Sequence, residues 1–175
     1  MTPTRKIFTI GHSTHSSEYF IELLNQFQIN CLIDVRSMPA SKFNPQFNQL
    51  NLKRLLQNHD IVYMHFKEEF GARREKDKTV LDKNGRVCFD LVHKTKSFQK
   101  GVERVEHGIS KGFRIALMCA ESNPLECHRF SMISSYLHKA GFEVCHILKD
   151  KTSKTHAELE TELLKKYAKK LPKPS

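Results

Sequence analysis

The sequence lacks the features that mark a membrane or secreted protein. Among its 175 residues, no apolar run approaches the roughly 18 residues needed to cross a bilayer. No basic, apolar leader opens the chain, so we expect a cytoplasmic protein that does not bind membranes. Internal repeats and linkers are also missing, which predicts a single domain.

Cysteine is present, but its number and spacing do not suggest a disulfide framework. The chain has five cysteines, an odd number, at irregular intervals. This usage is typical of a protein in a reducing compartment. Cys31, Cys88 and Cys145 lie on strand-like segments, where we expect them to be buried and unreactive.

Acidic residues are outnumbered by basic ones. Lysine and arginine together number 29, aspartate and glutamate 19, and the formal net charge is +10. This charge favours an acidic partner such as a phosphate-bearing small molecule or nucleic acid. The length suits one domain over residues 1–175, with a core at about 6–150 and a basic C-terminal helix and tail at about 151–175.

Short apolar segments alternate with amphipathic segments along the chain. This alternation predicts an α/β fold in which helices flank a mostly parallel sheet. A capping-box pattern, Thr155 to Glu158, starts the C-terminal helix. We expect strands at 6–10, 31–35, 61–65, 114–118 and 142–147, helices at 17–28, 51–58, 97–108, 124–141 and beyond 155, and a charged loop at 67–86.

The segment from Met118 to Arg129 holds the densest group of reactive side chains. Asn123 and Pro124 are typical of a helix start, and Glu126 is placed to complete a capping box. Free N–H groups at that start would favour an anion. Arg129 falls in the apolar stripe of the same predicted helix, so its buried charge would need a carboxylate or a bound anion as partner.

Three loops of the predicted sheet leave the carboxyl ends of strands, where ligands of parallel α/β sheets bind. We expect their polar side chains to converge on one site. These side chains are His12 and Ser13 after the first strand, Asp34 and Arg36 after the second, and Cys119, Glu121, Cys127, His128 and Arg129 after the fourth.

Two further loops carry cations. The charged loop that contains Arg73 and Arg74 is either a solvated connector or a mobile cover that brings an arginine to a bound anion. Another loop places Phe43 and Phe47 beside Lys42. Those rings would either pack in the core or stack on nucleic-acid bases.

Several motifs in a fixed order carry a resemblance to a known family. They are Thr9–Thr14, Leu32–Arg36, Pro39 with Ser41, Tyr63, Gly71–Arg74, Met118–Glu121 and Cys127–Arg129. With these motifs, the chain from about Lys6 to His156 resembles the DUF488 family, whose function is unsettled. The resemblance implies a compact α/β domain and a site, but no reaction. The chain departs from the family pattern at Leu125, where an aromatic residue is usual, at Ala72 in place of glycine, and at Lys42 in place of a frequent arginine.

Thiol and acid–base chemistry both fit the reactive segment. A thiolate of Cys119 or Cys127 would act as a nucleophile, with Arg129 lowering its pKa. Neither cysteine is followed six residues later by the arginine of phosphatase and rhodanese loops, which weakens a reaction of that kind. Glu121 would act as a general acid or base, or would only pair with an arginine.

Metal binding is a further hypothesis, because Cys119, Cys127, His128 and His12 are all of ligand type. Their spacing lacks a Cys-x-x-Cys pair. In addition, adjacent Cys127 and His128 would lie about 100° apart around a helix. We therefore expect neither a metal nor another cofactor.

The favoured function is an enzyme, a hydrolase or transferase, that acts on a nucleotide or nucleic acid. The alternative is a nucleotide or nucleic-acid binding protein without turnover, and a third hypothesis is a structural domain whose arginines pair internally. The sequence leaves the oligomeric state open. We expect Cys119, Glu121 and His128 to be catalytic, and His12, Ser13, Asp34, Arg36, Arg73, Arg74, Cys127 and Arg129 to bind the substrate or its anionic group.

Overall fold

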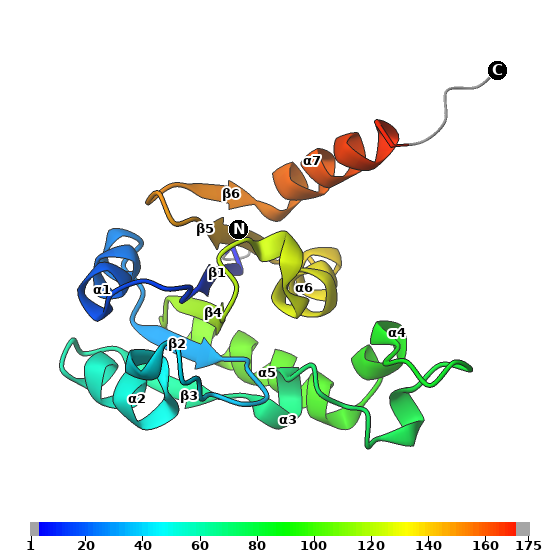
Figure 1. The fold of residues 1–175 in the computed structure, drawn as a ribbon, viewed down its shortest axis with the longest axis horizontal. Coiled ribbons are helices and arrows are strands. Elements are labelled where there is room, and N and C mark those ends of the chain that lie inside the picture. The colour runs from blue at the N-terminus through cyan, green and yellow to red at the C-terminus, as the bar shows by residue number, and fades with distance from the viewer. Residues whose placement is uncertain (1–3, 171–175) are drawn as a thin grey trace.

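The structure, a computed structural model that describes residues 4–170, contains a six-stranded sheet with the order β3-β2-β4-β1-β5-β6 (Figure 1). Strands β1 to β5 are parallel and β6 is antiparallel to β5, which confirms the expected α/β fold. Residues 1–3 and 171–175 of the expected domain lie outside the described residues. The strands are β1 (Lys6–Gly11), β2 (Cys31–Asp34), β3 (Val62–His65), β4 (Ile115–Cys119), β5 (Glu143–Ile147) and β6 (Ser153–Thr155).

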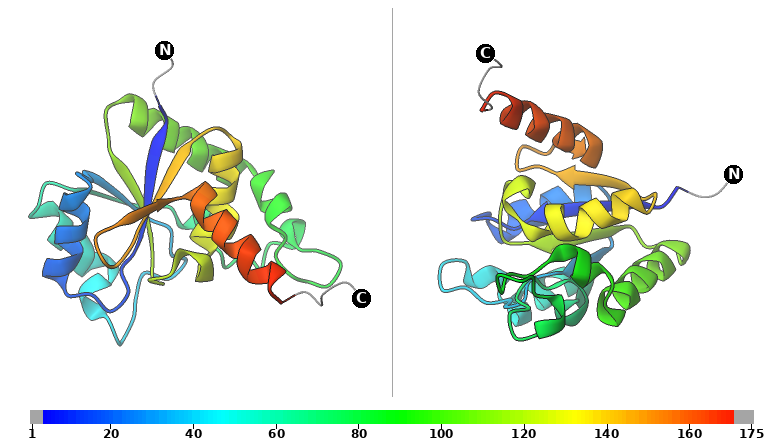
Figure 2. Two further views of the ribbon diagram at one scale, coloured as in Figure 1. Left: turned by 90° about the horizontal axis from the view of Figure 1, so that it is seen from above. Right: turned by 90° about the vertical axis from the view of Figure 1, so that its right-hand side faces the viewer.

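Helices cover both faces of the sheet (Figure 2). Side chains of α1 and α2 pack on one face, and those of α3 to α6 pack on the other. Within residues 4–170, no helix has the length and apolar character that a membrane span requires. The helices are α1 (Ser17–Gln26), α2 (Gln49–Gln57), α3 (Lys67–Phe70), α4 (Phe89–His93), α5 (Lys96–Ser110), α6 (Ser135–Lys139) and α7 (His156–Ala168).

The alternation of side chains along the strands divides the core into two apolar layers. On β1, Ile7 faces the α5 side together with Leu117 of β4. The neighbouring Phe8 and Ile10 face the α1 side together with Met118. Successive strand residues point to opposite faces, so a fully buried strand needs an apolar residue at nearly every position. This requirement explains why the short apolar segments of the sequence identify the central strands.

The helix expected at 124–141 is interrupted, and the prediction of one continuous helix is wrong. A 3-10 turn covers Pro124–Glu126, and Cys127 then adopts extended backbone with φ −130° and ψ 144°. A π-helical turn, Arg129–Ser134, leads into α6. Asn123 caps the start as expected, because its side chain accepts a hydrogen bond from the Leu125 N–H.

The charged segment 67–86 is anchored to the domain rather than forming one long loop. It contains α3, a 3-10 turn at Lys78–Val80 and an antiparallel bridge between Leu81 and Val87. Phe70 and Val80 are fully buried in the core. These apolar contacts hold both halves of the segment against the body of the protein.

Phe43 and Phe47 lie in the same loop and were given the same two alternatives, core packing or base stacking. Their environments in the structure are opposite. Phe47 is fully buried between α1 and α2, so core packing was the correct explanation for this residue. Phe43 is 93% exposed. The loop after β2 therefore presents one aromatic ring to solvent.

The C-terminal helix α7 begins where the sequence predicts. The Thr155 side chain accepts a hydrogen bond from the Glu158 N–H, and the Glu158 carboxylate accepts one from the Thr155 N–H. Beyond Leu159, which is buried, the helix leaves the sheet, and Leu164 and Tyr167 are exposed. Strand β6 was not predicted, because Ser-Lys-Thr at a sheet edge has no apolar pattern.

A chain of buried polar side chains connects β1 to α7. His146 Nδ1 lies 2.6 Å from Thr9 Oγ1, and His146 Nε2 lies 3.1 Å from His156 Nδ1. Both rings are buried, and His156 Nε2 lies 3.4 Å from a carboxylate oxygen of Glu160. Burial lowers the pKa of His146 to about 3, with the neighbouring His156 and Arg129 charges acting in the same direction. His146 is therefore neutral in the folded protein at neutral pH.

This neutral histidine predicts a loss of stability in mild acid. In the folded state the His146 pKa is about 3, against 6.5 for an unperturbed histidine, so the unfolded chain binds more protons between these values. The part of the folding stability that depends on neutral His146 is fully present above pH 6.5 and is lost as the pH falls towards 3. We expect the free energy of unfolding to drop by up to about 1.4 kcal/mol per pH unit from this residue in urea titrations between pH 7.5 and 4.5. The same slope in His146→Gln and wild type would contradict this explanation.

Candidate functional site

Three loops meet at the carboxyl edge of the sheet because their strands are neighbours in register. Gly11 of β1 pairs with Cys119 of β4, and Asp34 of β2 pairs with Met118 of β4. The His12 N–H donates to the Cys119 carbonyl, which ties the first loop to the third. The structure thus brings together the loop residues that the sequence separated by about a hundred positions.

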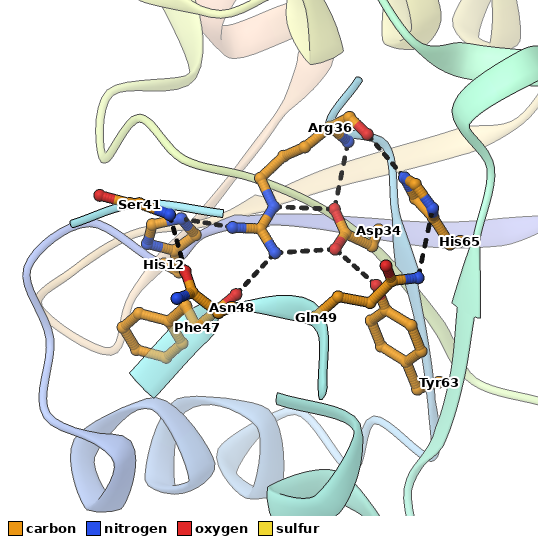
Figure 3. Close-up of polar contacts among 9 residues, drawn as sticks. All are labelled: His12, Asp34, Arg36, Ser41, Phe47, Asn48, Gln49, Tyr63 and His65. Atoms are coloured by element: carbon orange, nitrogen blue, oxygen red, sulfur yellow. Dashed lines mark hydrogen bonds and ion pairs between the residues drawn. The ribbon is translucent and has the colours of Figure 1, made fainter. Parts of the chain in front are cut away.

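A buried ion pair between Asp34 and Arg36 forms one half of the site (Figure 3). The Arg36 guanidinium donates from Nε and Nη2 to the two carboxylate oxygens at 2.9 and 2.8 Å, and the Arg36 backbone N–H donates at 3.1 Å. Tyr63 Oη donates a further hydrogen bond at 2.7 Å. Asp34 is fully buried, and these donors compensate for the loss of water around its charge.

His12 extends this pair (Figure 3). Its Nδ1 lies 2.8 Å from the Ser13 carbonyl, so Nδ1 carries the proton and Nε2 accepts from Arg36 Nη1 at 3.2 Å. The ring stacks on Phe47 with 4.6 Å between centroids. Burial lowers the pKa of His12 to about 4, and the Arg36 charge contributes. His12 is therefore a neutral, fixed acceptor at neutral pH.

Two residues of the site were not among the predicted site residues, although Tyr63 is one of the family motifs. Tyr63 binds Asp34, and His65 Nε2 lies 2.7 Å from the Arg36 carbonyl (Figure 3). Burial, and then the charge and hydrogen bond of Asp34, raise the pKa of Tyr63. Both residues lie on β3, next to β2, so the predicted strand at 61–65 could have identified them through the same carboxyl-edge argument.

A cluster of two thiols, an imidazole and a carboxylate forms the other half of the site. Cys119 Sγ lies 3.3 Å from Glu121 Oε2 and 3.7 Å from His128 Nδ1. Cys127 Sγ lies 3.8 Å from the same His128 nitrogen. Both cysteines are buried, His128 is half-buried and Glu121 is exposed, so the cluster reaches solvent through its carboxylate. We call these four residues the sulfur cluster.

The orientation of His128 is determined by backbone carbonyls. His128 Nε2 lies 3.2 Å from the Val35 carbonyl and 3.1 Å from the Phe70 carbonyl. Since carbonyl oxygens only accept, Nε2 carries the proton. Nδ1 then presents its lone pair to the two sulfur atoms.

The sulfur cluster favours negative charge on one of its two thiols. A hydrogen bond from Cys119 lowers the pKa of Cys127 to about 5 against the effect of burial, and the Arg129 charge acts in the same direction. Burial pushes the Glu121 pKa upward, but hydrogen bonds to its carboxylate and the Arg129 charge outweigh it, and the Glu121 pKa is lowered.

Among its protein partners, Arg129 binds backbone carbonyls rather than a carboxylate. It is fully buried, and its Nη1 and Nη2 donate to the backbone carbonyls of Glu121 and Ser122 at 2.7 and 3.3 Å. Nε donates to Thr9 Oγ1 at 3.3 Å. Among the described residues, backbone carbonyls of the turn after β4 point inward at the guanidinium and take the place of the expected carboxylate.

The other predicted anion-binding residues are divided between structural and exposed positions. Arg74 donates to the carbonyls of Glu68, Glu69 and Gly71 at the end of α3. Arg73 is exposed, with Nη1 2.9 Å from Met38 Sδ in the loop after β2. The Ser13 backbone N–H donates to the Ala120 carbonyl at 2.9 Å.

The structure removes the geometric objection to a metal site. The ligand atoms of Cys119, Cys127 and His128 all lie within 4.8 Å of one another. The expected separation of about 100° between Cys127 and His128 holds only if both lie in one helix. In the structure, Cys127 has extended backbone and precedes the π-helical turn. Adjacent residues can therefore direct both side chains to one point.

In a comparison with protein families, residues 16–137 match the family described as "Domain of unknown function DUF488". The chain belongs to the DUF488 family. The matched range includes the Asp34–Arg36 pair and the whole sulfur cluster, whereas Gly11 and His12 precede it. Searches among curated proteins and among solved structures found no match.

Gly11 is required by the close approach of two loops. A Cβ atom at Gly11 would lie 1.7 Å from the Glu121 carbonyl oxygen, a contact with backbone that no rotamer change relieves. We expect Gly11→Ala to displace the turn after β4 and lower the free energy of unfolding by about 3 kcal/mol, the upper end of overpacking costs. Chemical denaturation would measure this loss.

Gly108→Ala is the matched control. Its Cβ would meet only the flexible end of Ile115 at 3.0 Å, within α5, so the change in stability should be small. Equal stability of Gly11→Ala and wild type would contradict the close approach.

Proposed function

We propose that this DUF488 protein is an enzyme, a hydrolase or transferase, that acts on a phosphate-bearing substrate of the nucleotide or nucleic-acid class. The observation that carries the proposal is the sulfur cluster. Two thiols, an imidazole lone pair and a carboxylate meet within 3.3 to 3.8 Å at the carboxyl end of β4. Side chains that can bind a substrate, attack it or transfer protons, gathered in one place, are typical of a catalytic site.

The proposed roles follow from exposure and orientation. Glu121 is the exposed member, so it accepts the proton of the attacking group. Cys119 and His128 lie behind it and face the reacting atoms. The Asp34–Arg36 pair uses its donors within the protein, and we assign it the role of holding the loops around the cluster rather than binding substrate directly.

Exposed cations and one exposed ring support a phosphate-bearing substrate. Arg73 contacts Met38 in the loop after β2, and Lys42 and the 93% exposed Phe43 belong to the same loop. A cation binds phosphate, and an aromatic ring stacks on a base. The net charge of +10 attracts such a substrate over a longer range.

The second candidate is a nucleotide or nucleic-acid binding protein without turnover. The exposure of Phe43 and the lysines in the last turn of α7 favour it, because neither feature depends on the sulfur cluster. The cytoplasm is the proposed location for both candidates, and the five free cysteines support it.

The test combines thermal shift with turnover assays on nucleotides and short DNA and RNA oligonucleotides. We expect a ligand of this class to raise the melting temperature of the wild type. Glu121→Gln should keep that shift and lose about 100-fold or more in rate, because it removes the proton acceptor without removing the binding loop. Arg73→Ala should reduce the shift and leave the rate at saturating substrate nearly unchanged.

The control is Glu126→Gln, an exposed glutamate in the adjacent turn that contacts none of the proposed groups. It should match the wild type in both assays. A ligand that stabilises the protein and is never turned over would favour the binding candidate. Unchanged turnover in Glu121→Gln would remove Glu121 from the mechanism.

A further inference from the structure

The sulfur cluster has the donor atoms and spacing of a zinc site. In tetrahedral coordination, with Zn–S near 2.3 Å and Zn–N near 2.0–2.1 Å, a sulfur and a nitrogen ligand lie about 3.6 Å apart. The two S···N separations here are 3.7 Å from Cys119 and 3.8 Å from Cys127 to His128 Nδ1. We propose that Cys119, Cys127 and His128 bind one Zn²⁺ ion.

The surroundings of these three ligands are also those of a metal site. The imidazole of a metal-binding histidine donates its other N–H to a carbonyl or carboxylate, and His128 Nε2 donates to the Val35 and Phe70 carbonyls. The Arg129 backbone N–H points at Cys127 Sγ from 3.4 Å. Such contacts orient the ligand atoms before any metal arrives.

Charge balance favours a dication at this point. Two thiolates would place two negative charges among residues that are 95% buried, and a divalent cation neutralises them. Thiolate and imidazole ligands in tetrahedral arrangement select zinc among the common divalent cations. Cys31, Cys88 and Cys145 lie outside the cluster and supply matched controls.

Glu121 occupies the position of a proton acceptor beside this ion. Its Oε2 lies 3.3 Å from Cys119 Sγ, on the exposed side of the cluster. Three protein ligands leave the fourth position of zinc to water, and zinc makes that water a nucleophile by favouring loss of its proton. Zn²⁺ and Glu121 would then convert water to bound hydroxide plus a carboxylic acid, without any oxidant or reductant. This catalytic part rests on the proposed function, whereas zinc binding does not.

The test measures zinc in the full chain, purified without a histidine tag and dialysed after addition of zinc. We expect about one zinc per chain in the wild type, Cys88→Ser and Cys145→Ser, and a tenth or less in Cys119→Ser, Cys127→Ser and His128→Gln. Glu121→Gln should keep its zinc. Zinc retained by Cys127→Ser, or lost by Glu121→Gln, would overturn the assigned ligand set.

Cobalt titration of the wild type keeps the proposal testable if a ligand variant does not fold. Co²⁺ bound by two thiolates gives a charge-transfer absorption band, and zinc should abolish it by displacement. A folded wild type that binds neither metal would overturn the proposal. One zinc per chain in a protein without turnover would retain the metal site and reject only the proposed enzyme.

Discussion

The buried guanidinium of Arg129 connects β1, in the centre of the sheet, to the turn after β4 that carries the site. It holds the turn after β4 through the carbonyls of Glu121 and Ser122, and it reaches β1 through Thr9. Thr9 in turn contacts His146, the first member of the buried histidine chain that leads to α7. A buried charge is tolerated only where polar groups surround it. Arg129 can therefore be buried only because these carbonyls point inward, and the carbonyls in turn need its N–H groups as donors.

The Asp34–Arg36 pair acts as a second fixed point, on the other side of the cluster. Removing one partner of a buried pair leaves an uncompensated charge, which is why neither residue is free to serve a ligand at low cost. The pair also fixes its own loop, because Arg36 Nη2 donates to the Phe47 carbonyl at 2.8 Å and the Arg36 carbonyl contacts His65. Arg36 and Arg129 therefore position the loops of the site, and the exposed side chains around them are the ones that face solvent.

The central strands and the start of α7 were predictable from sequence because each depends on local pattern. Strands β1, β2, β4 and β5 have the apolar character of buried sheet, and Thr155 with Glu158 forms the expected capping box. The break at Cys127 was not predictable, since the apolar spacing from Leu125 to Leu137 also fits a regular helix. Tertiary packing of Arg129 and of the π-helical turn overrides that spacing.

The sequence by itself determined the α/β class, the family and the grouping of reactive residues at strand ends, because hydrophobic periodicity and short motifs are local properties. Only the tertiary structure decided what each group contacts. Arg129 binds backbone carbonyls instead of a carboxylate, and the extended backbone of Cys127 brings its sulfur to His128 Nδ1 instead of directing the two side chains apart around a helix. The physical reason is that a hydrogen bond or a ligand set depends on distances between segments, which the pairing of β1 with β4 fixes and no local pattern encodes.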